Sequence, residues 1–151
     1  MNKEGYLRKD VATITGVKFA TVQQYTERRL ITASIDNPSG RGTNRRYSTG
    51  DMVELLVCRK LVELGVKHKD ISKIMDILRN LKIGGISPVR DYRENIGFYV
   101  VIMNHGTEKM SIQGSVLNLD HNSNFEIMGT DFENVIIINT GDILKKIKLN
   151  T

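Results

Sequence analysis

The stretch DVATITGVKFATVQQYTERR, residues 10–29, decides the fold of the first part of the chain. Small and apolar residues recur in it with successive spacings of +4, +1, +5 and +3: Ala12, Gly16, Val17, Val22 and Tyr25. Gly16 can adopt the positive φ of a tight turn without steric strain, and Val17 and Val22 can pack between two helices. The spacing therefore predicts a helix-turn-helix, with an ordinary helical hairpin as the alternative.

The second helix of this pair would carry a polar outer face. If Val22 and Tyr25 are buried, the outward positions repeat at three- and four-residue spacing, at Lys18, Thr21, Gln24 and Arg28. Lys and Arg suit phosphates or guanine, and Gln can pair with adenine. The second helix is the one that enters the major groove. We therefore expect contacts to double-stranded DNA from this helix, from Lys18, Thr21, Gln23, Gln24, Tyr25 and Arg28.

A second basic stretch, GRGTNRRYSTGDM, spans residues 40–52. Ser48 followed three residues later by Asp51 predicts a capping box, so a helix begins here and the basic run precedes it. The run itself holds three arginines and one asparagine: Arg41, Asn44, Arg45 and Arg46. By itself such a run is either a solvated turn or a loop directed at an anion.

Composition and charge limit the classes of protein that the chain can belong to. No apolar run approaches the roughly 18 residues of a membrane span, and the N-terminus lacks the apolar core of a signal peptide, so we expect a cytoplasmic protein without membrane contact. Residues 1–95 carry 18 Lys and Arg against 11 Asp and Glu, whereas residues 96–151 carry 4 against 6. The net charges of +7 and −2 place any bound polyanion at the front half.

Two kinds of periodicity divide the chain. Helical spacing runs through residues 53–64 and 71–78, whereas the residues after 96 alternate or are β-branched. Between them, Gly84, Gly85 and Pro88 indicate a linker. The sequence predicts an α+β protein with a helical domain at 1–80, a linker at 81–95 and a small β-rich domain at 96–151. We expect about five or six strands, among them residues 97–103, 109–119, 124–128 and 134–139; residues 141–150 could form a strand or a helix.

Taken together, YLRKDVATITGVKFATVQQYTERRLITAS (6–34) and NRRYSTGDMVELLVCRKLVELGVKHKDISKIM (44–75) resemble the winged helix-turn-helix of the MerR family. The resemblance covers about residues 5–79 and implies four helices. It also implies a wing laid against the DNA backbone, formed by Arg41, Asn44, Arg45 and Arg46 and closed by a buried Tyr47, which we count among the DNA-binding residues.

The chain departs from the family pattern at several positions. Lys18 replaces a Ser-like cap, Gln23 and Gln24 replace an Arg and a Tyr, and Arg29 replaces the glycine that usually ends the second helix. The family's long dimerisation helix is also missing, because GGISP (84–88) and a β-rich segment stand in its place.

The sequence contains few residues in patterns typical of a catalytic site or a metal site. The single cysteine, Cys58, falls on a helical apolar face, so we expect a buried thiol there. His68, His105 and His121 are scattered rather than clustered, as metal ligands would have to be. No phosphate-binding glycine loop or nucleophile–base pair is recognisable. We therefore expect no enzyme, no cofactor and no metal.

The apolar run VIIIN, residues 135–139, must be covered, either as the interior of the β-rich domain or as a subunit interface. The leading hypothesis is a sequence-specific DNA-binding transcriptional regulator that acts by operator occupancy. It would be a homodimer or higher homo-oligomer through residues 96–151, and the same β-rich domain could instead receive a protein partner or a small ligand. The alternative is an excisionase-like or DNA-segregation adaptor, which would bind repeated DNA sites and a protein partner through the C-terminal domain. A protein-only interaction module is the third class.

Overall fold

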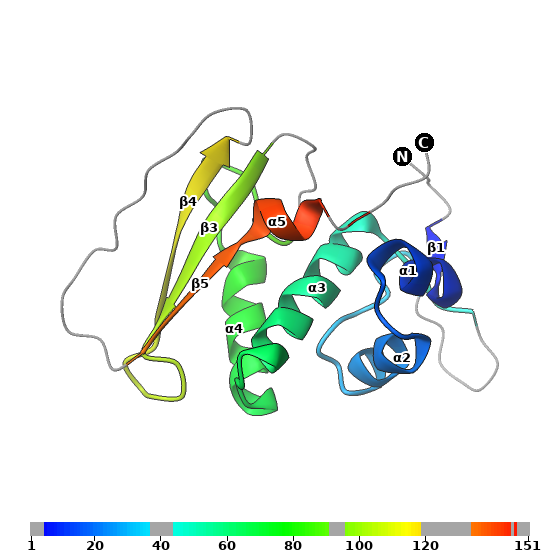
Figure 1. The fold of residues 1–151 in the computed structure, drawn as a ribbon, viewed down its shortest axis with the longest axis horizontal. Coiled ribbons are helices and arrows are strands. Elements are labelled where there is room, and N and C mark those ends of the chain that lie inside the picture. Colours follow the sequence, from blue (N-terminus) through cyan, green and yellow to red (C-terminus); the bar gives the residue numbers. More distant parts are fainter. Residues whose placement is uncertain (1–4, 37–43, 91–95, 119–133, 146, 148–151) are drawn as a thin grey trace.

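The computed structural model describes residues 5–36, 44–90, 96–118, 134–145 and 147. It has an α+β fold, as expected, with the helix-turn-helix at one end, a small antiparallel sheet at the other and two longer helices between them (Figure 1). In chain order the elements are β1 (Tyr6–Leu7), α1 (Arg8–Thr15), α2 (Phe19–Glu27), β2 (Arg46–Tyr47), α3 (Thr49–Glu63), α4 (His68–Asn80), β3 (Ile96–Met103), β4 (Ser111–Asn118), β5 (Val135–Asn139) and α5 (Thr140–Leu144).

The helix-turn-helix forms as the spacing predicts. Gly16 ends α1 with a φ of 72°, and its N–H donates to the Ala12 carbonyl at 3.0 Å. Lys18 stands at the start of α2 without a side-chain capping hydrogen bond. Val22 and Tyr25 are buried against the rest of the domain. Because these inner positions are fixed, the opposite face of α2 is presented to solvent.

A short antiparallel ribbon forms the base of the wing. In β1 and β2, Tyr6 pairs with Tyr47 and Leu7 pairs with Arg46. Arg46 also bridges Asp36 on its other side, with the Arg46 N–H donating to the Asp36 carbonyl at 2.8 Å. The two arms of the wing are therefore held together at their base. Arg41, at the predicted tip, lies outside the described residues.

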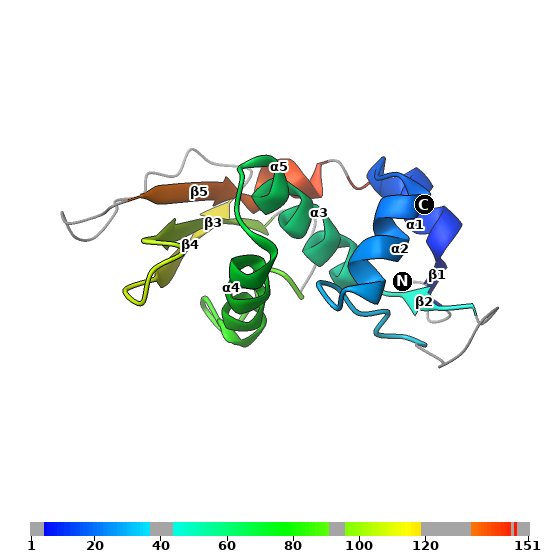
Figure 2. The ribbon, with the colours of Figure 1, turned by 90° about the horizontal axis from the view of Figure 1, so that it is seen from below.

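Helix α3 is the central element of the fold. The predicted capping box is confirmed: the Asp51 N–H donates to Ser48 Oγ at 3.1 Å, and the Ser48 N–H donates to Asp51 Oδ2 at 2.8 Å. Residues 50–58 are all buried, because the helix-turn-helix covers α3 on one side and α4 and the sheet cover it on the other (Figure 2). One apolar core, which includes Val11, Leu55 and Phe98, extends through both halves of the chain.

The described part of the predicted linker, residues 81–90, is docked on this core. Ile83 and Ile86 bridge each other around a Gly84–Gly85 turn, and residues 87–89 are buried. The backbone of Arg90 lies directly over Gly50 at the start of α3, where an added Cβ would approach the Arg90 carbonyl oxygen to 2.8 Å. The proposed boundaries at residues 80 and 96 stay predictions.

The described sheet has the strand order β4-β3-β5, with both pairings antiparallel. Three of the predicted strands are confirmed, the segment 124–128 lies outside the described residues, and the ambiguous end begins as helix α5. The inner face of the sheet joins the common core through Phe98, Val100, Ile102, Ile136 and Ile138. No helix of the described part is long and apolar enough to cross a membrane.

Candidate nucleic-acid interface

The outer face of α2 carries the polar side chains expected there. Lys18, Gln24 and Arg28 are exposed, and Thr21 and Gln23 are half-buried beside them. All five therefore lie on or next to one surface of the second helix of the helix-turn-helix, which is the surface that faces the bases in this motif. Whether they contact DNA stays a prediction.

Glu27 adds a carboxylate to the same surface. Gln23 Nε2 donates to Glu27 Oε1 at 2.9 Å, so the Gln23 side chain is oriented along the helix. A carboxylate repels phosphates but accepts hydrogen bonds from the amino group of cytosine. The face is therefore mixed rather than uniformly basic, which suits contacts to base edges more than contacts to the backbone alone.

The two tyrosines that we expected to contact DNA are both buried. Tyr25 is 5% exposed, and this burial raises its pKa; Tyr47 is fully buried. Thr26 Oγ1 donates to the Val22 carbonyl, so the Tyr47 hydroxyl donates to Thr26 Oγ1 at 2.9 Å. In this structure the Tyr47 ring fixes the wing strand against α2, and its hydroxyl is directed at Thr26 rather than at the surface.

The described wing residues differ in exposure. Asn44 is exposed, whereas Arg45 and Arg46 are half-buried. Arg45 Nε is buried and has no hydrogen-bond partner among the described residues. A buried donor without a partner is costly unless a ligand or water satisfies it. A phosphate oxygen is an acceptor of the right chemistry for this guanidinium.

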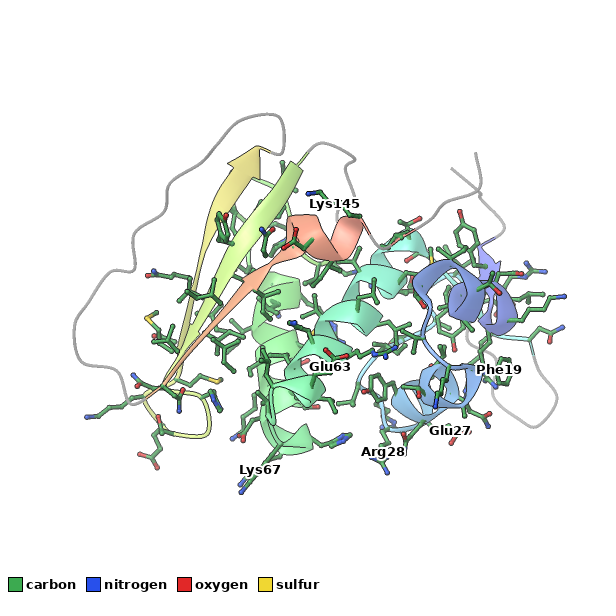
Figure 3. The ribbon with its side chains drawn as sticks, viewed as in Figure 1. Phe19, Glu27, Arg28, Glu63, Lys67 and Lys145 are labelled. Carbon is green, nitrogen blue, oxygen red and sulfur yellow. The ribbon has the colours of Figure 1, made fainter. Side chains whose placement is uncertain are left out.

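Two further groups of residues lie at this surface; Arg28 was predicted from the sequence, whereas Arg8, Phe19 and His68 were not. The Arg8 guanidinium stacks over the ring of Phe19, which is 49% exposed, at 5.2 Å from its centroid. Arg28 Nη1 donates to His68 Nε2 at 3.4 Å, which brings the beginning of α4 beside the end of α2. Figure 3 shows Glu27, Arg28 and Lys67 along the same edge of the molecule. The only sequence signal for the second group was the basic run in VKHKD (66–70).

A buried carboxylate holds the wing base in place. Asp51 Oδ2 accepts hydrogen bonds from the Ser34 N–H at 2.8 Å, Ser34 Oγ at 2.7 Å and the Ser48 N–H at 2.8 Å. Ser34 precedes the wing and Ser48 follows it. One side chain therefore ties both ends of the wing to the first turn of α3.

Two arginines complete this buried network. Arg90 Nη1 lies 2.7 Å from Asp51 Oδ1 and 3.2 Å from Glu54 Oε1. Burial alone would lower the pKa of Arg90, but its hydrogen bond to Asp51 and the charge of Glu54 raise it overall. Arg79 donates to Glu54 at 3.0 Å and to the Leu30 carbonyl at 2.8 Å. The network therefore reaches the segment that follows α2.

The placement of the His, Cys, Asp and Glu side chains among the described residues bears on metal binding and on thiol reactivity. Among the described residues, no group of three His, Cys, Asp or Glu side chains is placed to hold a metal ion. Cys58 is buried as expected, and burial raises the pKa of its thiol to about 12. At neutral pH the thiol is therefore protonated and inert.

Comparison with known proteins agrees with the geometry. Residues 6–77 match the model of the MerR HTH family regulatory proteins. Uncharacterized HTH-type transcriptional regulators of Mycobacterium bovis and Mycobacterium tuberculosis are 22% identical over 95 residues, which is 63% of this chain. The matched region spans 42% of the length of these relatives, so the similarity concerns one part of them.

Proposed function

Because residues 6–77 form a MerR-like helix-turn-helix domain, we propose that this protein is a sequence-specific DNA-binding transcriptional regulator. The observation that carries the proposal is the exposed polar face of α2, held beside a wing whose base is fixed by Tyr47 and Asp51. A rigid support of this kind positions base-reading side chains before DNA arrives, which lowers the entropic cost of binding. The protein would act by binding, without catalysis, in the cytoplasm.

Each part of the surface has a distinct role in this proposal. Gln24 and Arg28 would contact base edges in the major groove, with Lys18 and Thr21 beside them. Asn44, Arg45 and Arg46 would hold the flanking backbone, together with Arg41 at the wing tip. Phosphate contacts fix the register of the protein on the duplex, whereas base contacts select the sequence.

Two copies would be joined through residues 96–151. A two-fold dimer presents two recognition helices to two half-sites, so the bound sequence would be an inverted repeat. A protein bound to such a site near a promoter prevents the polymerase from reaching the promoter, which makes repression the simplest mode of action.

Fluorescence anisotropy tests this proposal. A labelled duplex from upstream of the protein's own gene is compared with a scrambled duplex of equal length, at low and near-physiological salt. We expect a preference for the upstream duplex that survives the higher salt. Equal and steeply salt-dependent binding to both would indicate backbone contacts alone. No binding to either duplex at low salt would contradict DNA binding.

A further inference from the structure

The outer edge of β5 lacks the features that usually protect an edge strand. β5 is the last strand in the order β4-β3-β5, and no described residue pairs with its other side. Its sequence, VIIIN, contains no charge and no proline. Natural proteins protect exposed edges with charged residues, prolines, bulges or a covering element. An edge without them is a surface for pairing with another strand.

The outer face of the sheet is also apolar next to this edge. Val135 and Ile137 are 37% and 43% exposed, while Ile136 and Ile138 between and after them point into the core. The register places Val135 opposite Met103, so their side chains share the outer face. Val101 lies on this face opposite Ile137. Met103 and Val101 are themselves buried, at 5% and 2% exposed, so the exposed apolar surface on this face is that of Val135 and Ile137 on β5.

We propose that β5 pairs antiparallel with β5 of a second copy, with Ile137 opposite Ile137, so that the two sheets become continuous. Antiparallel pairing of identical edges is two-fold symmetric, so it closes after two copies and leaves no free edge of this kind. The pairing would also bury the two exposed Ile137 side chains against each other. This inference rests on the proposed function, because it gives the interface of the dimer that would read a two-fold site.

The charge distribution favours a second copy over a charged partner. The three strands β3, β4 and β5 contain no Asp, Glu, Lys or Arg. Identical edges can therefore meet without repulsion between like charges, whereas an acidic or basic partner strand would find no complementary charge to pair with. The helix-turn-helix formed by α1 and α2 lies at the opposite end of the molecule (Figure 1), so this pairing leaves it free.

The oligomeric state of the full chain tests the inference. Light scattering coupled to size exclusion should give twice the mass of the 17.1 kDa chain for the wild type. Ile137→Lys should give the single-chain mass, because pairing would bury two lysines against each other. Ile77→Lys is the matched control: Ile77 is 40% exposed but lies on α4 rather than on the β5 edge, and its substitution should leave the dimer mass unchanged. Circular dichroism should show that both variants are folded.

A disulfide gives a second measurement that does not depend on tolerance of a lysine. Directly opposed residues of an antiparallel pair have Cα atoms about 4.5–5.5 Å apart, which is within the range that a disulfide can bridge. Ile137→Cys should therefore form a covalent dimer under mild oxidation, and Ile77→Cys should not. The background is low, because the only native cysteine, Cys58, is buried with a pKa of about 12.

The outcomes separate this inference from the proposed function. If the wild type is a dimer, the Ile137→Lys variant is also a dimer and the Ile137→Cys variant forms no disulfide, then the β5 interface is wrong. That result would leave the dimer itself in place. A monomeric wild type at all concentrations would overturn both the interface and the dimer, and would indicate that the chain covers its own edge. Neither result bears on DNA binding, which the anisotropy measurement decides by itself.

Discussion

The two halves of this molecule are held together by different physical means. The helical half buries two carboxylates, Asp51 and Glu54, with side chains no more than 1% exposed, and pairs them with Arg79 and Arg90. The described strands of the sheet half, β3, β4 and β5, contain no charged residue, and the sheet joins the core through aliphatic and aromatic side chains. Directional hydrogen bonds fix the wing base in one geometry, whereas apolar burial stabilises the sheet without specifying what covers its edge.

This difference matches the two tasks that we propose. A DNA-reading surface needs its elements held at defined positions, and a buried network that is fully hydrogen-bonded provides that rigidity. An interface between identical copies needs a surface that can pack against an identical surface without repulsion between like charges, which an uncharged strand provides. Four substitutions and one selection experiment test this division, beginning with the largest expected effect.

Removing the central carboxylate should damage the helical half most. Asp51→Ala leaves Arg90 without its closest partner and removes acceptors from Ser34 and Ser48. We expect a loss of about 3–5 kcal/mol in the free energy of unfolding, because buried donors lose their acceptor and the two arginines are left with Glu54 as their one buried carboxylate. Urea unfolding followed by circular dichroism measures the change.

Asp76→Ala is the control for that substitution. Asp76 pairs with Arg79, but its side chain is 75% exposed, so we expect a loss below about 0.5 kcal/mol. Equal effects of the two substitutions would show that the buried network does not stabilise the helical half.

Shortening an apolar side chain at the centre of the sheet should have the next largest effect. Ile102 is fully buried on β3, between Ile112 and Ile136 of the neighbouring strands. We expect Ile102→Ala to lower the free energy of unfolding by about 2–4 kcal/mol, from lost burial and the cavity left behind. Because one core spans both halves, helix and sheet signals should shift together in denaturant. A sheet that melts first while the helices stay folded would contradict a shared core.

The exposed face of α2 should decide DNA affinity. Arg28→Ala should weaken binding to the preferred duplex about tenfold, or about 1.4 kcal/mol, because it removes a donor from the reading surface. Lys109→Ala removes the same charge from an exposed turn of the sheet half and should leave the affinity unchanged. Anisotropy titrations at one salt concentration measure both. Equal losses would mean that net charge alone, rather than this face, drives binding.

The smallest effect should be a gain in stability. Arg29, just after the C-cap of α2, has a φ of 58°, in the left-handed region where glycine is favoured. Arg29→Gly should therefore stabilise the fold by about 1 kcal/mol. At the neighbouring Arg28, φ is −80°, so Arg28→Gly should give no gain. Thermal unfolding distinguishes the two, and a lower midpoint for Arg29→Gly would contradict the strain at this residue.

Local features could be predicted from the sequence, whereas long-range contacts could not. The turn at Gly16 and the capping box at Ser48 depend on residues within four positions of each other, so their spacing reveals them. The pairing of Arg90 with Asp51 joins residues 39 positions apart, and the contact of Arg28 with His68 joins residues 40 positions apart. Periodicity carries no information about such pairs.

The same limit applies to the linker and the sheet. Glycine and proline predicted a break near residues 84–88, but not that this segment docks on α3. The β-branched apolar run VIIIN predicted β5 as a strand without predicting that it lies at the edge of the sheet, because strand order depends on how the whole chain packs. Burial of Tyr47 followed from the family resemblance, whereas its hydrogen bond to Thr26 required the structure.

The most direct test of the central claim is selection of duplexes from a random library by the full chain at near-physiological salt, followed by sequencing. We expect one enriched motif made of two inverted half-sites, and we expect Gln24→Ala to lose preference at one position within each half-site. Enrichment of direct repeats would favour an adaptor that fills arrays of sites. No enrichment of any sequence would contradict the claim that the exposed face of α2 reads DNA.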